Sequence, residues 1–261
     1  MTKESIKTKR ILILTAMDVE AAAIFSAFGS KKLVPCSIDL GIDAFLLSSD
    51  NVEYWLANMG IGLGSAAITV AILAAKIKPH AIIQLGVAGA VSPSLEIGDA
   101  VLATSIIQHD SFFSGENDRE LMAPGALYLS TPKEQRENPE FRCSEKLLAL
   151  FRKNIAPALS IPVHEGLLLS GSEFVGSFAS KKALSDRFSK ALAVEMESAS
   201  VAMVARRMSI PTLAVKTIAD RLRPDKTIAH DYGRFLDLAA KNAASIAQRL
   251  VHLDAASFEG P

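Results

Sequence analysis

Cysteine is scarce in this chain: Cys36 and Cys143 are its only two among 261 residues. They lie far apart in the sequence and neither belongs to a CxxC pair. The chain therefore lacks both a disulfide framework and the cysteine spacing of a zinc site. We predict two free thiols in a reducing compartment, no bound metal and no cofactor.

Excess charge and long hydrophobic runs are also missing. Lys and Arg together number 28, Asp and Glu also number 28, and the net charge is zero, so no strongly basic face is expected to bind nucleic acid. The longest apolar stretch, roughly residues 63–77, is too short and too rich in alanine to span a bilayer. The polar segment 1–10 lacks the apolar core of a signal peptide. These features predict a cytoplasmic protein with neither nucleic acid nor a membrane as partner.

Apolar residues, in contrast, are abundant, at 49% of the chain. Short apolar runs alternate with longer segments of helical periodicity, which predicts a largely parallel or mixed β-sheet with helices on both faces. No internal repeat or linker divides the sequence, so we predict one domain over residues 1–261. Strands are expected at 11–14, 44–47, 52–57, 81–85, 100–107, 163–169, 192–195 and 212–217, and helices at 18–28, 65–78, 144–154, 198–208 and 231–250.

The stretch of residues 111–142 breaks this alternation. It is polar at its start and is then punctuated by Pro124, Pro132 and Pro139. Loops of this length are uncommon in compact domains, and those that occur are often functional. We predict a lid or an interface segment here, with plain disorder as the alternative.

Carboxylates stand at the ends of three predicted strands. Glu20 follows the first strand closely, Glu195 and Glu197 close another, and Asp220 ends the apolar run that begins at Pro211. Open α/β sheets build ligand sites at the carboxyl ends of their strands, so these acids are expected in one pocket. Each acid alone also has an ordinary explanation, as a first-turn helix acid or a turn aspartate.

Small and aromatic residues follow other predicted strands. The turn 60–64 has three glycines and precedes a helix, which suits either an anion or sugar cradle or a simple tight turn. The segment 86–89 would let a flat ligand approach the backbone, or let a helix pack closely. Phe174 lies in a segment rich in Gly and Ser, where an aromatic ring is typical of a stacking platform.

Several segments together resemble a known family. Ala193–Ala199 (AVEMESA) looks like the VEMEA signature of the purine nucleoside phosphorylase/nucleosidase superfamily, and Thr15–Glu20 resembles its N-terminal GAMxxE. Further blocks lie at 60–62, 86–89, 97–99 and 170–171. Within the superfamily the chain looks most like the 5'-methylthioadenosine/S-adenosylhomocysteine nucleosidases, from about residue 11 to residue 250. The resemblance implies a three-layer α/β/α domain with a central mixed, twisted sheet of the nucleoside phosphorylase type, and a homodimer.

The resemblance also implies catalytic roles. Asp220 would protonate N7 of the purine, and Glu20 would hold or deprotonate the attacking water. Cleavage of an N-glycosidic bond develops positive charge on the sugar and negative charge on the base. Asp220 would act on the charge of the base, and Glu20, with its water, on that of the sugar. An acid that works near neutral pH must keep its proton, so Asp220 is expected to be sheltered from water.

Binding roles follow from the same resemblance. Glu197 would accept hydrogen bonds from the ribose 2'- and 3'-hydroxyls, and Met196 would pack on the sugar. Phe174 would stack on the purine and the backbone of Val175 would read its Watson–Crick edge. The remaining residues of the predicted base site are Ala88 and Gly89.

Water is the expected nucleophile. Phosphorylases of the superfamily bind phosphate with arginines in the N-terminal loop and after the middle strand, and both places lack arginine here. Asp18 and Glu20 would repel phosphate. We therefore predict a purine nucleosidase that acts on a 5'-modified adenosine such as methylthioadenosine or S-adenosylhomocysteine, with a futalosine-type nucleoside as another option.

Two other functions stay open at this point. One is a phosphorylase with a divergent phosphate site. The other is a catalytically silent nucleoside-binding protein of the same fold, because a fold does not fix a function. Val87 and Ala219 stand where the nucleosidases usually carry serine, which favours the silent protein, whereas the joint presence of Glu20, Glu197 and Asp220 favours an enzyme.

Overall fold

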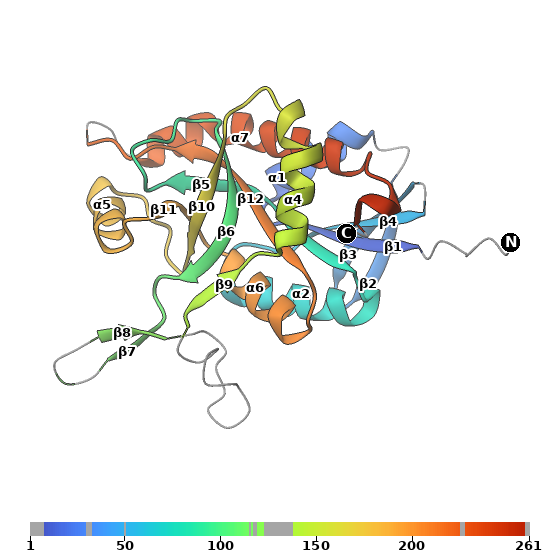
Figure 1. The fold of residues 1–261 in the computed structure, drawn as a ribbon, viewed down its shortest axis with the longest axis horizontal. Coiled ribbons are helices and arrows are strands. Elements are labelled where there is room, and N and C mark those ends of the chain that lie inside the picture. Colours follow the sequence, from blue (N-terminus) through green and yellow to red (C-terminus); the bar gives the residue numbers. More distant parts are fainter. Residues whose placement is uncertain are drawn as a thin grey trace, which may run out of the picture.

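The computed structural model describes residues 8–29, 33–49, 51–114, 116, 119–122, 138–224 and 228–258. Its central feature is one ten-stranded sheet that takes strands from both ends of the chain, in the order β11-β10-β6-β12-β5-β1-β4-β3-β2, with β9 paired to β6 (Figure 1). The strands of this sheet are β1 (Lys9–Thr15), β2 (Val34–Asp39), β3 (Ile42–Ser49), β4 (Val52–Asn58), β5 (Ala81–Ala90), β6 (Ala100–Gln108), β9 (Glu140–Arg142), β10 (Val163–Ser170), β11 (Ala191–Glu195) and β12 (Thr212–Asp220).

Helices cover both faces of the sheet, and β1 explains why. Successive side chains of a strand point to opposite faces, and both sets are apolar in β1. Ile11 and Ile13 pack into the core under α1, α4 and α7, whereas Leu12 and Leu14 pack into the core under α2 and α6. The helices of the described residues are α1 (Asp18–Phe28), α2 (Leu63–Ile77), α4 (Glu145–Asn154), α5 (Phe178–Arg187), α6 (Ser198–Arg207) and α7 (Ile228–Leu250), with short 3-10 turns at Ala156–Ala158 and Ala255–Phe258.

The sheet is mixed, as the sequence predicts. Strands β4, β1, β5 and β12 run parallel to their neighbours in this order, and β12 is antiparallel to β6. Because β1, β5 and β12 are parallel, their carboxyl ends lie at the same edge of the sheet. The three-layer α/β/α architecture is therefore confirmed, and its topology brings the acids after β1 and β12 toward one place.

Some local predictions were wrong or incomplete. Residues 86–89 were expected to close a strand, but they lie inside β5, which continues to Ala90. Neither β2 nor α5 was predicted from the sequence: β2 is short and contains a proline, and α5 is mostly polar. The interval 111–142 contains a hairpin of β7 (Phe112–Ser114) and β8 (Arg119–Leu121), and β9. The rest of that interval lies mostly outside the described residues, so its role as a lid stays a prediction.

None of the described helices combines the length and the apolar character that crossing a bilayer demands.

Candidate active site

A cavity opens at the carboxyl ends of the parallel strands. Together with the open space at its mouth, the cavity measures about 590 Å³. All eight residues assigned to the site from the sequence line it: Glu20, Ala88, Gly89, Phe174, Val175, Met196, Glu197 and Asp220. The structure thus brings the predicted residues together, whereas their chemical roles stay predictions.

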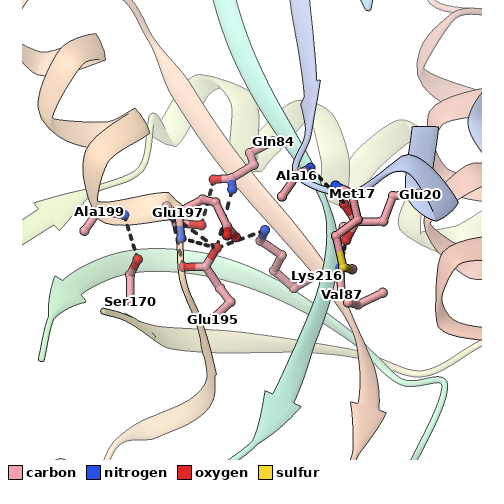
Figure 2. Close-up of polar contacts among 12 residues, drawn as sticks. Ala16, Met17, Glu20, Gln84, Val87, Ser170, Glu195, Glu197, Ala199 and Lys216 are labelled. Carbon is pink, nitrogen blue, oxygen red and sulfur yellow. Dashed lines mark hydrogen bonds and ion pairs between the residues drawn. The ribbon is translucent and has the colours of Figure 1, made fainter. Parts of the chain in front are cut away.

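Glu20 is held in the cavity by three backbone N–H groups. Its Oε2 accepts hydrogen bonds from the backbone N–H groups of Ala16 and Met17, at 2.8 and 2.9 Å. Its Oε1 accepts a third from the N–H of Val87, at 2.8 Å. Figure 2 shows these three residues around the carboxylate. Because a carboxylate has about four acceptor sites, one remains for a water in the cavity.

Asp220 enters the cavity from the last residue of β12. The pairing of β12 with β5 shifts register between Ile218 and Asp220, and such a bulge re-aims the side chain that follows it. Asp220 is only 3% exposed, so the expected shelter is present. Its Oδ1 accepts a hydrogen bond from the Lys181 ammonium, which is itself fully buried. This lysine was not predicted from the sequence.

Glu195 belongs to the support of the site. Its Oε2 lies 3.0 Å from Nζ of Lys216, and both side chains are buried. Its carboxylate also accepts from the backbone N–H of Ser198 and from Gln84 (Figure 2). Burial alone would raise the pKa of Glu195, but Lys216 and the N–H donors hold it below its ordinary value. Glu195 is therefore a fixed anion that anchors the start of α6.

Glu197 has the opposite electrostatic environment. Burial, followed by the neighbouring charge of Glu195, raises the pKa of Glu197 to about 8. Its Oε1 accepts a hydrogen bond of 2.8 Å from the N–H of Gly62. The sequence left open whether the glycine turn 60–64 binds an external anion or a sugar. In the structure, the turn holds a carboxylate of the chain itself, that of Glu197.

The two outer glycines of 86–89 admit the acids of the site. A Cβ on Gly86 would lie 2.6 Å from Oε1 of Glu20. A Cβ on Gly89 would lie 2.6 Å from Nζ of Lys181 and 2.9 Å from Oδ1 of Asp220. The absent side chains let carboxylates approach the backbone of β5 more closely than any other residue allows.

Aromatic and apolar groups form the mouth of the cavity. Phe174 is 48% exposed, and its ring meets Tyr232 edge to face at 5.1 Å between centroids. The Tyr232 hydroxyl in turn lies 3.1 Å from Sδ of Met17. Three further lining residues were not predicted from the sequence: Tyr232, Met17 and Ile61. Met17 and Ile61 lie within segments that the sequence singles out, whereas Tyr232 comes from α7, far from every motif.

Comparison with known proteins places this site in a family. A family model of the phosphorylase superfamily matches residues 10–252. The chain belongs to this superfamily. It is 30% identical over 239 residues to a 5'-methylthioadenosine/S-adenosylhomocysteine nucleosidase of Bacillus cereus, covering 90% of this chain and 95% of that protein.

Solved structures of the superfamily agree with the fold. The chain resembles a Helicobacter pylori 5'-methylthioadenosine/S-adenosylhomocysteine nucleosidase in complex with a pyrrolidine-based ligand, with a TM-score of 0.80 and 28% identity, over 94% of this chain and 99% of that one. It also resembles the futalosine hydrolase of the same organism, with a TM-score of 0.79 and 26% identity, over 94% of this chain and 99% of that one. This superfamily member is therefore similar to two kinds of nucleoside hydrolase.

Proposed function

We propose that the protein is a purine nucleosidase that hydrolyses the N-glycosidic bond of a 5'-modified adenosine and releases adenine. The observation that carries this function is the placement of Glu20, Glu197 and Asp220 in one cavity, from three separate elements. The similarity to nucleosidases over almost the full chain supports it.

The proposed mechanism assigns one task to each acid. Asp220 donates a proton to N7 of the purine, so that the base leaves with the electron pair of the C1'–N9 bond. Glu20 holds a water and takes its proton as the water oxygen bonds to C1'. Glu197 accepts hydrogen bonds from the ribose hydroxyls, while Met196 contacts the sugar and Phe174 stacks on the base. Val175, Ala88 and Gly89 complete the base site.

Water suits this cavity better than phosphate. Among the described residues that line it, acids are frequent and neither lysine nor arginine occurs: the acids are Glu20, Glu173, Glu195, Glu197 and Asp220. A phosphate dianion would meet repulsion from the ionised carboxylates among them, such as Glu195. Hydrolysis therefore needs no group beyond those present.

The deciding experiment is an assay of free base from methylthioadenosine, S-adenosylhomocysteine, adenosine, inosine and a futalosine-type nucleoside, each with and without phosphate. We expect adenine release that does not depend on phosphate, and the order of rates identifies the 5' group. Release that requires phosphate and yields a sugar phosphate would contradict hydrolysis. If all substrates bind but none is cleaved, the protein is a silent nucleoside binder.

The raised pKa of Glu197 predicts how nucleoside binding depends on pH. Below pH about 8 the substrate-free carboxyl is mostly protonated, whereas donation from two ribose hydroxyls favours the ionised form. Affinity should therefore rise with pH up to about 8, by as much as about tenfold per unit. Calorimetry at pH 6.5 in two buffers of different ionisation enthalpy, with the Asp220→Asn variant to prevent turnover, should show release of nearly one proton.

Glu197→Gln is the control for this titration. The amide keeps the shape of the side chain but has no proton to release, so the buffer dependence of the binding enthalpy should vanish. An unchanged proton count in Glu197→Gln would assign the titration to another group of the cavity.

We also propose a cytoplasmic homodimer that is one domain over residues 1–261. Both cysteines are free thiols, and Cys143 is buried, which suits a reducing compartment. Ile61, at the cavity mouth, and Ile68 of α2 are 58% and 63% exposed, and large exposed apolar side chains of this kind suit a second copy. Sedimentation at micromolar concentration should give twice the mass of the chain, and a monomer would refute the dimer. Cell fractionation tests the compartment.

A further inference from the structure

The buried residue of helix α5 is a lysine, Lys181. The helix begins after Ser177, whose hydroxyl accepts the N–H of Ser180, and it is mostly polar. Over its full described length Lys181 is the only residue that is buried. A lone buried ammonium is very costly, so its position requires an anionic partner. Asp220 of the cavity is that partner.

Asp220 connects the buried lysine to the cavity. Asp220 lines the cavity, whereas Lys181 is not among the lining residues. Both side chains meet at Gly89, where a Cβ would collide with Nζ of Lys181 and with both carboxylate oxygens of Asp220. The residue before Asp220 is Ala219, which has no side-chain hydrogen-bond donor. The ammonium of Lys181 is a side-chain donor to Asp220 that does not itself line the cavity.

We propose that Lys181 is the positioning residue of the acid that protonates the purine: it fixes the carboxyl of Asp220 toward the base and stabilises the carboxylate left after proton transfer. This role rests on the proposed function of Asp220. In the step, the proton of the Asp220 carboxyl passes to N7 and the C1'–N9 electron pair goes to the base. The Asp220 carboxylate that remains is then neutralised by the Lys181 ammonium, and a solvent proton restores the acid.

This role has a signature in the pH profile. Turnover requires protonated Asp220, whereas the neighbouring ammonium of Lys181 favours the ionised carboxylate. Because of Lys181, the fall of kcat with rising pH, which is the alkaline limb of the profile, therefore occurs at a lower pH than it would without the lysine. The other titratable groups near the acid are Glu20 of α1, Glu173 between β10 and α5, Glu195 and Glu197 at the end of β11, Lys216 of β12 and Tyr232 of α7. Burial and the charges of Glu20 and Glu197 raise the pKa of Tyr232 to about 12, outside the range to be measured. Glu197 titrates in the substrate-free cavity and thus affects kcat/KM.

Lys181→Met tests the role, and Lys182→Met is a matched control. Lys182 is the next residue of the same helix, but it is exposed and pairs with Asp186. In Lys181→Met we expect kcat on the low-pH plateau to fall about tenfold, the alkaline limb of kcat to move up by about 1–3 pH units, and KM to change less than kcat. Lys182→Met should behave as wild type. Lys181→Arg keeps the charge, so its limb should stay near that of wild type even if its bulk lowers the rate.

Unfolding of the same variants gives a readout that needs no activity. In wild type the pair stabilises the fold more as pH rises above the range in which Asp220 ionises. In Lys181→Met the buried acid prefers its proton, so stability should fall as pH rises from 4 to 8, and the difference in melting temperature from wild type should grow. Lys182→Met should show no such trend.

The outcomes separate this role from the proposed function. An alkaline limb that moves up in Lys181→Met but not in Lys181→Arg supports it. A limb that stays in place overturns it, even if the rate falls, because that result describes packing only. If wild type releases no base from any nucleoside, the proposed function fails. The unfolding series still tests the ion pair in that case. A difference in melting temperature between wild type and Lys181→Met that does not vary with pH would overturn the ion pair as well.

Discussion

Asp220→Asn should abolish base release, lowering kcat by about 10²–10⁴-fold, the usual contribution of a general acid. The amide keeps the shape of the side chain but cannot give a proton to the purine, so nucleoside binding should persist with little change. Rapid measurement of adenine release, with equilibrium binding of the uncleaved nucleoside, checks both statements. Turnover near the wild-type rate would remove Asp220 from the role of acid.

Asp220→Asn should also lower stability, because it leaves the Lys181 ammonium buried beside a neutral amide. Loss of one partner of a buried ion pair costs about 3–5 kcal/mol, so rates must be measured well below the melting temperature of the variant. Asp99→Asn is the matched control. Asp99 is also buried and lies 3.0 Å from His164, but it does not line the cavity. It should change stability without a comparable loss of turnover.

Glu20→Gln should produce the second large loss, again about 10²–10⁴-fold in kcat. The amide cannot take the proton of the attacking water. It also faces three backbone N–H donors, at Ala16, Met17 and Val87, with a single acceptor oxygen. At least one donor then loses its partner, which should cost about 1–3 kcal/mol of stability.

The control for Glu20→Gln is Glu165→Gln. Glu165 pairs with Arg152 at the surface, and exposed pairs contribute little, so this variant should keep both its rate and its melting temperature. If Glu20→Gln retains activity within about threefold at a temperature where it is folded, its carboxylate does not activate the water.

Much of the fold could be predicted because its elements carry local signals. The run Ile11–Leu14 is apolar on both faces, which is typical of a strand buried between two helical layers. The helix Asp18–Phe28 was predicted with the limits that the structure shows, because Gly29 stops it in a conformation with positive φ. Where the local signal was weak, as in the polar helix α5, the prediction failed.

The set of acids in the cavity was also accessible from the sequence, but their environments were not. The pattern put Glu20, Glu195, Glu197 and Asp220 at strand ends, and parallel strands bring such ends to one edge. It did not reveal that Glu195 is held as an anion by Lys216 while Glu197 keeps its proton to about pH 8. These two acids are separated by one residue, and only burial and through-space charges distinguish them.

The sequence alone indicated an α/β fold through its hydrophobic periodicity, and its short motifs resemble those of the superfamily to which the chain belongs. Both signals are local properties of the chain. Only the tertiary structure decided which groups surround each acid. Lys181 and Asp220 are 39 positions apart, and Tyr232 reaches the mouth from α7. A charge interaction or a ring contact depends on distance in space, and that distance is set by the packing of the whole sheet rather than by any segment of the sequence.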